Sequence, residues 1–140
     1  MVAKGYARTY RATSILTASP GQLVLMLYDG ALKAMALSRE AFAATDDPRR
    51  IETINTQLLK AQAILTELQN GLNMEAGGEF ALTMHRLYDY HNRRLLEANI
   101  RKQVEPVLEV ERLVRELRDA WAQMLAQQDG GSVERIRGVA

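Results

Sequence analysis

The sequence contains no cysteine, only three prolines and few aromatic residues. The absence of cysteine excludes disulfides and thiolate metal sites, and it fits a reducing compartment. Two phenylalanines, one tryptophan and five tyrosines leave most of the apolar mass to leucine, alanine, methionine, valine and isoleucine. Because proline is scarce and good helix formers dominate, the composition favours an all-α protein.

No part of the chain has the charge or the apolar length that nucleic-acid or membrane binding needs. The formal net charge is +1 and acids and bases are interleaved, so no basic patch is available for a phosphate backbone. The longest apolar run falls far short of the about 20 residues that span a bilayer. The N-terminus lacks the continuous apolar region of a secretory signal. We therefore predict a cytosolic protein with no nucleic-acid partner and no membrane insertion.

The most informative stretch begins at Ser19. Ser19 is a typical N-cap, Pro20 suits the first helical position, and Gln22 can complete a capping box. The residues 23–28 that follow are all apolar or aromatic. Consecutive helical residues point all round the axis, so one packed face cannot cover them. Either other helices surround this one, or part of its surface is left for a partner.

Breaks in the apolar pattern divide the chain into four predicted helices. Asp47-Pro48 marks one helix start, the glycine pair Gly77-Gly78 precedes another, and residues 100–103 form a short turn. Apolar residues recur in the later helices at alternating steps of three and four, which is typical of a packing seam. The predicted helices cover about residues 20–44, 48–72, 79–99 and 104–127.

Short connections force neighbouring helices to run antiparallel. The predicted fold class is therefore all-α, an antiparallel up-down-up-down four-helix bundle with a flexible N-terminal segment. The predicted domains are an N-terminal segment and possible groove lid at 1–18, the bundle at 19–127 and a disordered tail at 128–140. A frayed terminus would also explain residues 1–18. However, its tyrosines and its Ile-Leu pair favour contact with some apolar surface.

The two histidines offer little support for catalysis. A di-iron bundle needs Glu-x-x-His on two helices, but Leu82 and Tyr88 stand three residues before His85 and His91. The two imidazoles are six residues apart and point roughly 120° away from each other, so they cannot share a metal. His85 has the geometry of a phosphorelay histidine, although a plain surface residue is far commoner, and we expect His91 to be partly buried and hydrogen-bonded. We predict no enzyme, no metal and no cofactor.

Four stretches carry a more specific signal. They are residues 10–33 (YRATSILTASPGQLVLMLYDGALK), 60–68 (KAQAILTEL), 87–99 (LYDYHNRRLLEAN) and 109–121 (EVERLVRELRDAW). Taken in order and without large gaps, they resemble the FliS family of flagellin-specific export chaperones over about residues 6–124. Gly71, His91-Asn92 and Gln103 depart from the family pattern.

The resemblance implies a cytosolic four-helix chaperone without ATPase activity. Such a protein is expected to bind the disordered C-terminal region of flagellin, prevent its premature polymerisation and deliver it to a flagellar export gate component through a transient contact. The chaperone itself is expected to be a monomer or a weak homodimer. The alternatives are a self-associating structural helical bundle and a chaperone of another exported substrate.

The surplus apolar surface of the first helix is expected to form the groove that receives the partner as a helix. The predicted partner-binding residues of the bundle are Leu23, Leu27, Tyr28, Tyr88 and Tyr90. A second set is predicted to cover part of this groove when flagellin is absent, namely Tyr6, Tyr10, Ile15 and Leu16. For Leu23 and Leu27, a place in the core is an equally good interpretation, whereas tyrosines combine apolar area with a polar edge and suit exposed binding surfaces.

Overall fold

The computed structural model describes residues 19–139 of the chain, and the side chains of residues 19–128. These residues form α2 (Pro20–Ala43), α3 (Arg50–Asn70), α4 (Gly78–Arg101) and α5 (Glu105–Val139), with no strand among them. The predicted all-α class is confirmed. Within this described part, no helix is both long enough and apolar enough to cross a membrane.

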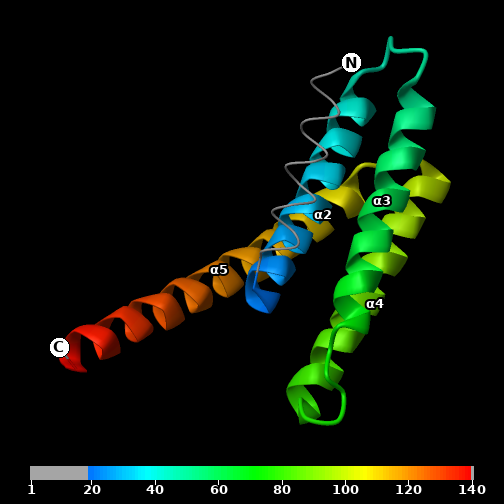
Figure 1. Cartoon of the computed structure of the whole chain (residues 1–140). Coiled ribbons are helices and arrows are strands. Elements are labelled where there is room, and N and C mark those ends of the chain that lie inside the picture. Colours follow the sequence, from blue (N-terminus) through cyan, green and yellow to red (C-terminus); the bar gives the residue numbers. More distant parts are fainter. Residues whose placement is uncertain (1–18, 140) are drawn as a thin grey trace.

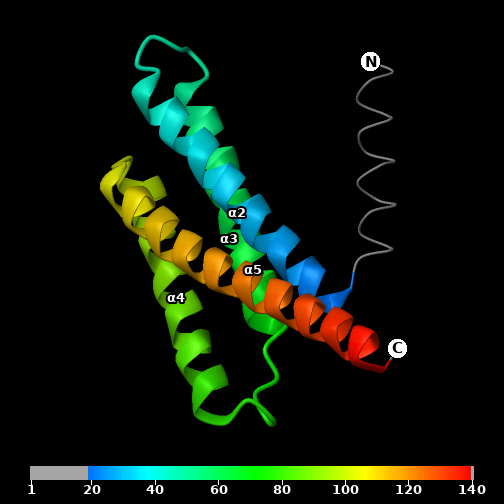
Figure 2. The ribbon, with the colours of Figure 1, turned by 90° about the vertical axis from the view of Figure 1, so that its left-hand side faces the viewer.

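The four helices alternate in direction and close into a ring. α2 packs against α3 and α5, and α4 packs against the same two helices, which confirms the up-down-up-down bundle (Figure 1). However, α5 slants across α2, and its C-terminal half runs away from the other three helices (Figures 1 and 2). This half of α5 leaves one end of the bundle less fully covered than a parallel arrangement would.

The start of α2 follows the sequence prediction closely. Ser19 is extended at φ −66° and ψ 160°, and its Oγ accepts a hydrogen bond of 3.2 Å from the backbone N–H of Gln22. α3 begins at Arg50, later than predicted, because a turn comes first: the Asp47 carboxylate accepts from the N–H of Arg49 at 2.9 Å. The predicted N-cap at Asp47 is therefore wrong: Asp47 stabilises the turn before the helix, and the N-cap is Arg49, which forms no side-chain capping bond.

The core fills the middle of the bundle. The predicted seam of α3 is buried except at its ends, and the valines of α5 at positions 107, 110 and 114 are fully buried. Met35 of α2 and Leu95 of α4 complete this layer with no exposed surface. Packing from all four helices therefore covers much of the apolar surface that the sequence provides.

The predicted end of the last helix near residue 127 is wrong. α5 continues to Val139, through the Gly130-Gly131 pair that we placed in a disordered tail at 128–140. A glycine costs about 1 kcal/mol in a helix, but extending an existing helix gains a hydrogen bond for each residue fixed. The glycine pair is therefore insufficient to end a helix that is already long.

His91 is more deeply buried than predicted. The residue has no exposed surface, and neither ring nitrogen has a hydrogen-bond partner among the described residues. The ring packs edge-on against Tyr88, with 6.3 Å between the ring centroids. The expected hydrogen bonding is therefore wrong. Burial disfavours the charged form and lowers the pKa of His91 to about 4, although the nearby Glu109 carboxylate opposes the shift.

Candidate partner-binding site

An apolar hollow of about 390 Å³ opens where α2 begins and α3 ends. All four helices contribute walls, and residues 117–124 in the middle of α5 form one side. Apart from Glu67, the lining carries no charged side chain. The lining residues are Val24, Leu27, Tyr28, Glu67, Leu68, Gly71, Leu72, Phe80, Met84, Tyr88, Leu117, Ala120, Trp121 and Met124.

The walls of the hollow are incompletely covered. Leu72, Met84 and Met124 are half-buried, and Phe80 is 71% exposed although it lines the same space. Large apolar groups exposed at the edge of a concave apolar surface are typical of a site that a partner covers. Phe80 and Met84 lie one helical turn apart on α4, so that helix presents an apolar edge at the opening.

Two tyrosines form the floor. The hydroxyl groups of Tyr28 on α2 and Tyr88 on α4 share a hydrogen bond of 2.5 Å, and both residues are buried. Burial raises the pKa of both phenols, so both stay neutral. Because the two hydroxyl groups hydrogen-bond to each other, the floor presents chiefly ring carbon atoms to the hollow.

Trp121 fixes the wall between α5 and α2. Its indole N–H donates to the backbone carbonyl of Gly21 at 2.8 Å. The Leu125 side chain packs onto Gly21, since a Cβ added at Gly21 would stand 2.6 Å from the Cδ2 of Leu125. A larger residue at position 21 would displace the end of the flexible Leu125 side chain.

The structure brings together three of the predicted binding residues. Leu27, Tyr28 and Tyr88 line the hollow, whereas Leu23 is half-buried outside its lining. Tyr90 lies on the seam between α4 and α5, where its hydroxyl donates to Glu109 at 2.7 Å. We expected the tyrosines to suit an exposed surface, but Tyr28 and Tyr88 are buried. They therefore form the floor of the hollow and not its edge.

The predicted covering residues lie outside the described part of the chain. These residues are Tyr6, Tyr10, Ile15 and Leu16. Their proposed role therefore stays a prediction.

Sequence reasoning missed the edge and the α5 wall of the hollow. Phe80 falls beside the three-four seam of α4 rather than on it, and the three-four spacing that continues from Val114 and Leu117 places Trp121 and Met124 on the packing seam of α5. Side-chain size was the signal that could have identified the α5 wall. The largest side chains of the α5 seam lie far along the helix from the short α4–α5 connection, where that connection no longer holds α5 against its neighbours.

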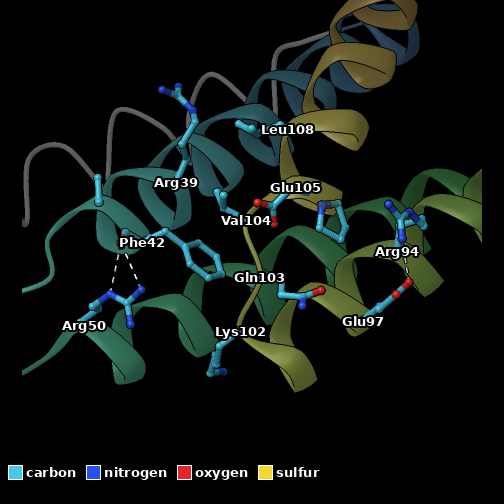
Figure 3. A pocket seen from close by; sticks show the side chains of 12 residues that line it. Arg39, Phe42, Arg50, Arg94, Glu97, Lys102, Gln103, Val104, Glu105 and Leu108 are labelled. Carbon is cyan, nitrogen blue, oxygen red and sulfur yellow. Dashed lines mark hydrogen bonds and ion pairs between the residues drawn. The ribbon is translucent and has the colours of Figure 1, made fainter.

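A second hollow, of about 750 Å³, lies at the opposite end of the bundle (Figure 3). Four cationic side chains line it, those of Arg39, Arg50, Arg94 and Lys102. Arg50 donates to the carbonyl of Phe42 at 3.1 and 3.2 Å, and Arg94 pairs with Glu97 at 2.7 Å (Figure 3). This larger space is charged and suits an apolar helix face poorly, so the smaller hollow is the better candidate.

The part of the chain that the structure describes contains no candidate metal site. No three His, Asp or Glu side chains gather there as possible ligands. The feature of this bundle that suits a ligand is its open apolar hollow, since such grooves can accommodate an amphipathic helix.

Comparison with known proteins identifies the family of this chain. A sequence model of the family described as "Flagellar protein FliS" matches residues 2–128. The chain is 40% identical over 119 residues to the flagellar secretion chaperone FliS of Bacillus subtilis (strain 168), covering 85% of each chain. It is 36% identical over 121 residues to the same chaperone of Salmonella typhimurium, covering 86% of this chain and 87% of the relative. The chain belongs to the FliS family of flagellar secretion chaperones.

Proposed function

We propose that this chain binds the disordered C-terminal region of flagellin in the apolar hollow, before flagellin is exported. The hollow itself is the observation that carries the proposal, because its walls are apolar, come from four helices and include the exposed Phe80. An amphipathic segment of a disordered tail can fold as a helix against such a surface. Its own apolar face is then covered, which prevents premature polymerisation in the cytosol.

Release at the export gate follows from the same energetics. Folding on binding typically consumes about 2–5 kcal/mol of the gross interaction energy, so a large apolar contact can still be reversible. We propose a transient contact with a component of the flagellar export gate, to which the chaperone delivers its cargo. No catalytic step is needed for this role, and the family is one of chaperones.

The experiment that tests this function is a titration of the full chain with a flagellin C-terminal peptide, followed by amide hydrogen exchange. We expect protection at residues 20–28 of α2 and 117–124 of α5, because both stretches border the hollow. A peptide from the central, folded part of flagellin serves as the control and should protect neither. Binding without protection at these stretches would contradict the proposed site.

We also propose that residues 1–16 cover part of the hollow when flagellin is absent. The segment is joined at Ser19 to the helix that provides Val24 and Leu27 of the lining, and it carries its own apolar residues at positions 6, 10, 15 and 16. A covering segment so tethered competes at a high effective concentration with any partner.

Deleting residues 1–9 is expected to increase the association rate and affinity of the flagellin peptide several-fold, because the competitor loses Tyr6. Stopped-flow fluorescence of a labelled peptide measures both constants. Weaker binding would instead make the segment part of the binding site. An unchanged rate and affinity would exclude both roles.

A further inference from the structure

The seam between α3 and α4 is held by side-chain amides. The amide of Asn99 donates to the side-chain carbonyl of Asn55 at 2.8 Å, and that of Gln62 donates to the backbone carbonyl of Asn92 at 3.3 Å. These bonds fix the register of two antiparallel helices. Residue 59, between Asn55 and Gln62 on α3, therefore lies across from residue 95 on α4, one position from Leu96.

An apolar strip results on the outside of this helix pair. Leu59 is 51% exposed, Leu96 46% and Ile100 73%. Two hollows of about 550 and 330 Å³ adjoin here, since Arg93 and Leu96 line both. Together they run along α4 from Arg86 to Arg101, a length of about 22 Å at 1.5 Å per residue. We call this surface, formed by Leu59, Arg86, Arg93, Leu96 and Ile100, the outer α3–α4 face.

The charges on this face that lack an ion-pair partner are positive. Arg86 and Arg93 form no ion pair with any described residue, and the Arg93 guanidinium lies over the Tyr90 ring, 6.0 Å from its centroid. The acids beside them have other neighbours, because Asp89 accepts from Gln69 at 2.7 Å and lies 3.7 Å from the Nδ1 of His85, and Glu97 pairs with Arg94 at 2.7 Å. A docked segment that carries carboxylates could therefore form ion pairs with Arg86 and Arg93.

We propose that the outer α3–α4 face docks an amphipathic helix of a partner protein, one with an apolar stripe flanked by glutamate or aspartate. The stripe would cover Leu59, Leu96 and Ile100, and the carboxylates would pair with the two arginines. A second copy of this chain fits less well, since its own arginines would approach these. The face is distinct from the apolar hollow, because Arg86 and Arg93 point away from the side of α4 that carries Tyr88.

The test uses a synthetic helical peptide of about 20 residues, which spans about 30 Å as a helix, with a leucine stripe flanked by glutamates. Its binding to the full chain is followed by fluorescence anisotropy, and the contact is mapped by NMR. We expect shifts at residues 59, 96 and 100. We also expect about tenfold weaker binding by an Arg86→Glu/Arg93→Glu variant, since two charge pairs become repulsive.

A Lys33→Glu/Arg49→Glu variant makes the same change in net charge elsewhere and should bind like the wild type. All four positions are exposed, so the variants should keep the helical signal and melting temperature of the wild type. Equal binding by the Arg86→Glu/Arg93→Glu variant, equal binding of a lysine-flanked peptide, or shifts confined to the apolar hollow would each overturn the proposal. Dimerisation that Leu96→Ser abolishes would assign the face to a second copy and would also overturn it.

Discussion

Replacing Phe80 with glutamate is expected to weaken binding of a flagellin C-terminal peptide about 100-fold. Covering a phenylalanine with a partner is worth about 1.5–3 kcal/mol, and each 1.4 kcal/mol changes the dissociation constant tenfold. The variant also places a carboxylate where an apolar face must dock, which adds a desolvation cost. Because Phe80 is 71% exposed, the change affects the edge of the hollow and spares the core. Fluorescence anisotropy with a labelled peptide measures the effect.

Ile51→Glu is the matched control. Ile51 is 51% exposed, so the same exchange of an exposed apolar residue for glutamate is made near the start of α3, outside the lining of the hollow. We expect this variant to bind as the wild type does. Both variants should melt within a few degrees of it, since surface substitutions usually change stability by about 0.5 kcal/mol or less. A Phe80→Glu protein that binds with wild-type affinity would remove the hollow from the site.

Acidification from pH 7 to pH 4 is expected to cost about 3 kcal/mol of folding stability through His91 alone. Its pKa is about 4 in the folded state, below the about 6.5 of an unfolded histidine. Above pH 6.5 neither state carries the proton and the stability is complete. Between pH 6.5 and pH 4 mainly the unfolded state binds the proton, so the stability falls. Urea unfolding at a series of pH values measures the slope.

Two variants separate His91 from the other titrating groups. His91→Leu, which has a similar size and no proton to bind, should flatten the profile between pH 6.5 and pH 4.5. His85→Gln, which removes the other, partly exposed histidine, is the control for a general effect of replacing a histidine. The pKa of Glu109 is lowered chiefly by the hydrogen bond from Tyr90, so the stability from this group is lost only in stronger acid, below about pH 4.5. A wild-type slope in His91→Leu would refute the role of the buried imidazole.

Part of the candidate site follows from local sequence features. The cap at Ser19 and the apolar run after it placed Leu27 and Tyr28 on an over-apolar first helix, and both line the hollow. Tyr88 was found as well, although as a buried floor residue rather than an exposed one. Phe80 was missed, because helical periodicity identifies residues that face a neighbouring helix but cannot identify those at the edge of a gap.

The sequence by itself determined the number of helices in the bundle, their order and the seams that bury Leu58, Leu65 and Val110, because breaks and three-four spacing act over a few residues. Only the tertiary structure decided that α5 slants away from its neighbours, that Tyr28 and Tyr88 meet across 60 positions of sequence and that Trp121 reaches the carbonyl of Gly21. These contacts depend on the angle at which helices cross. Side-chain packing between helices sets that angle, and the pattern of any one helix does not contain it.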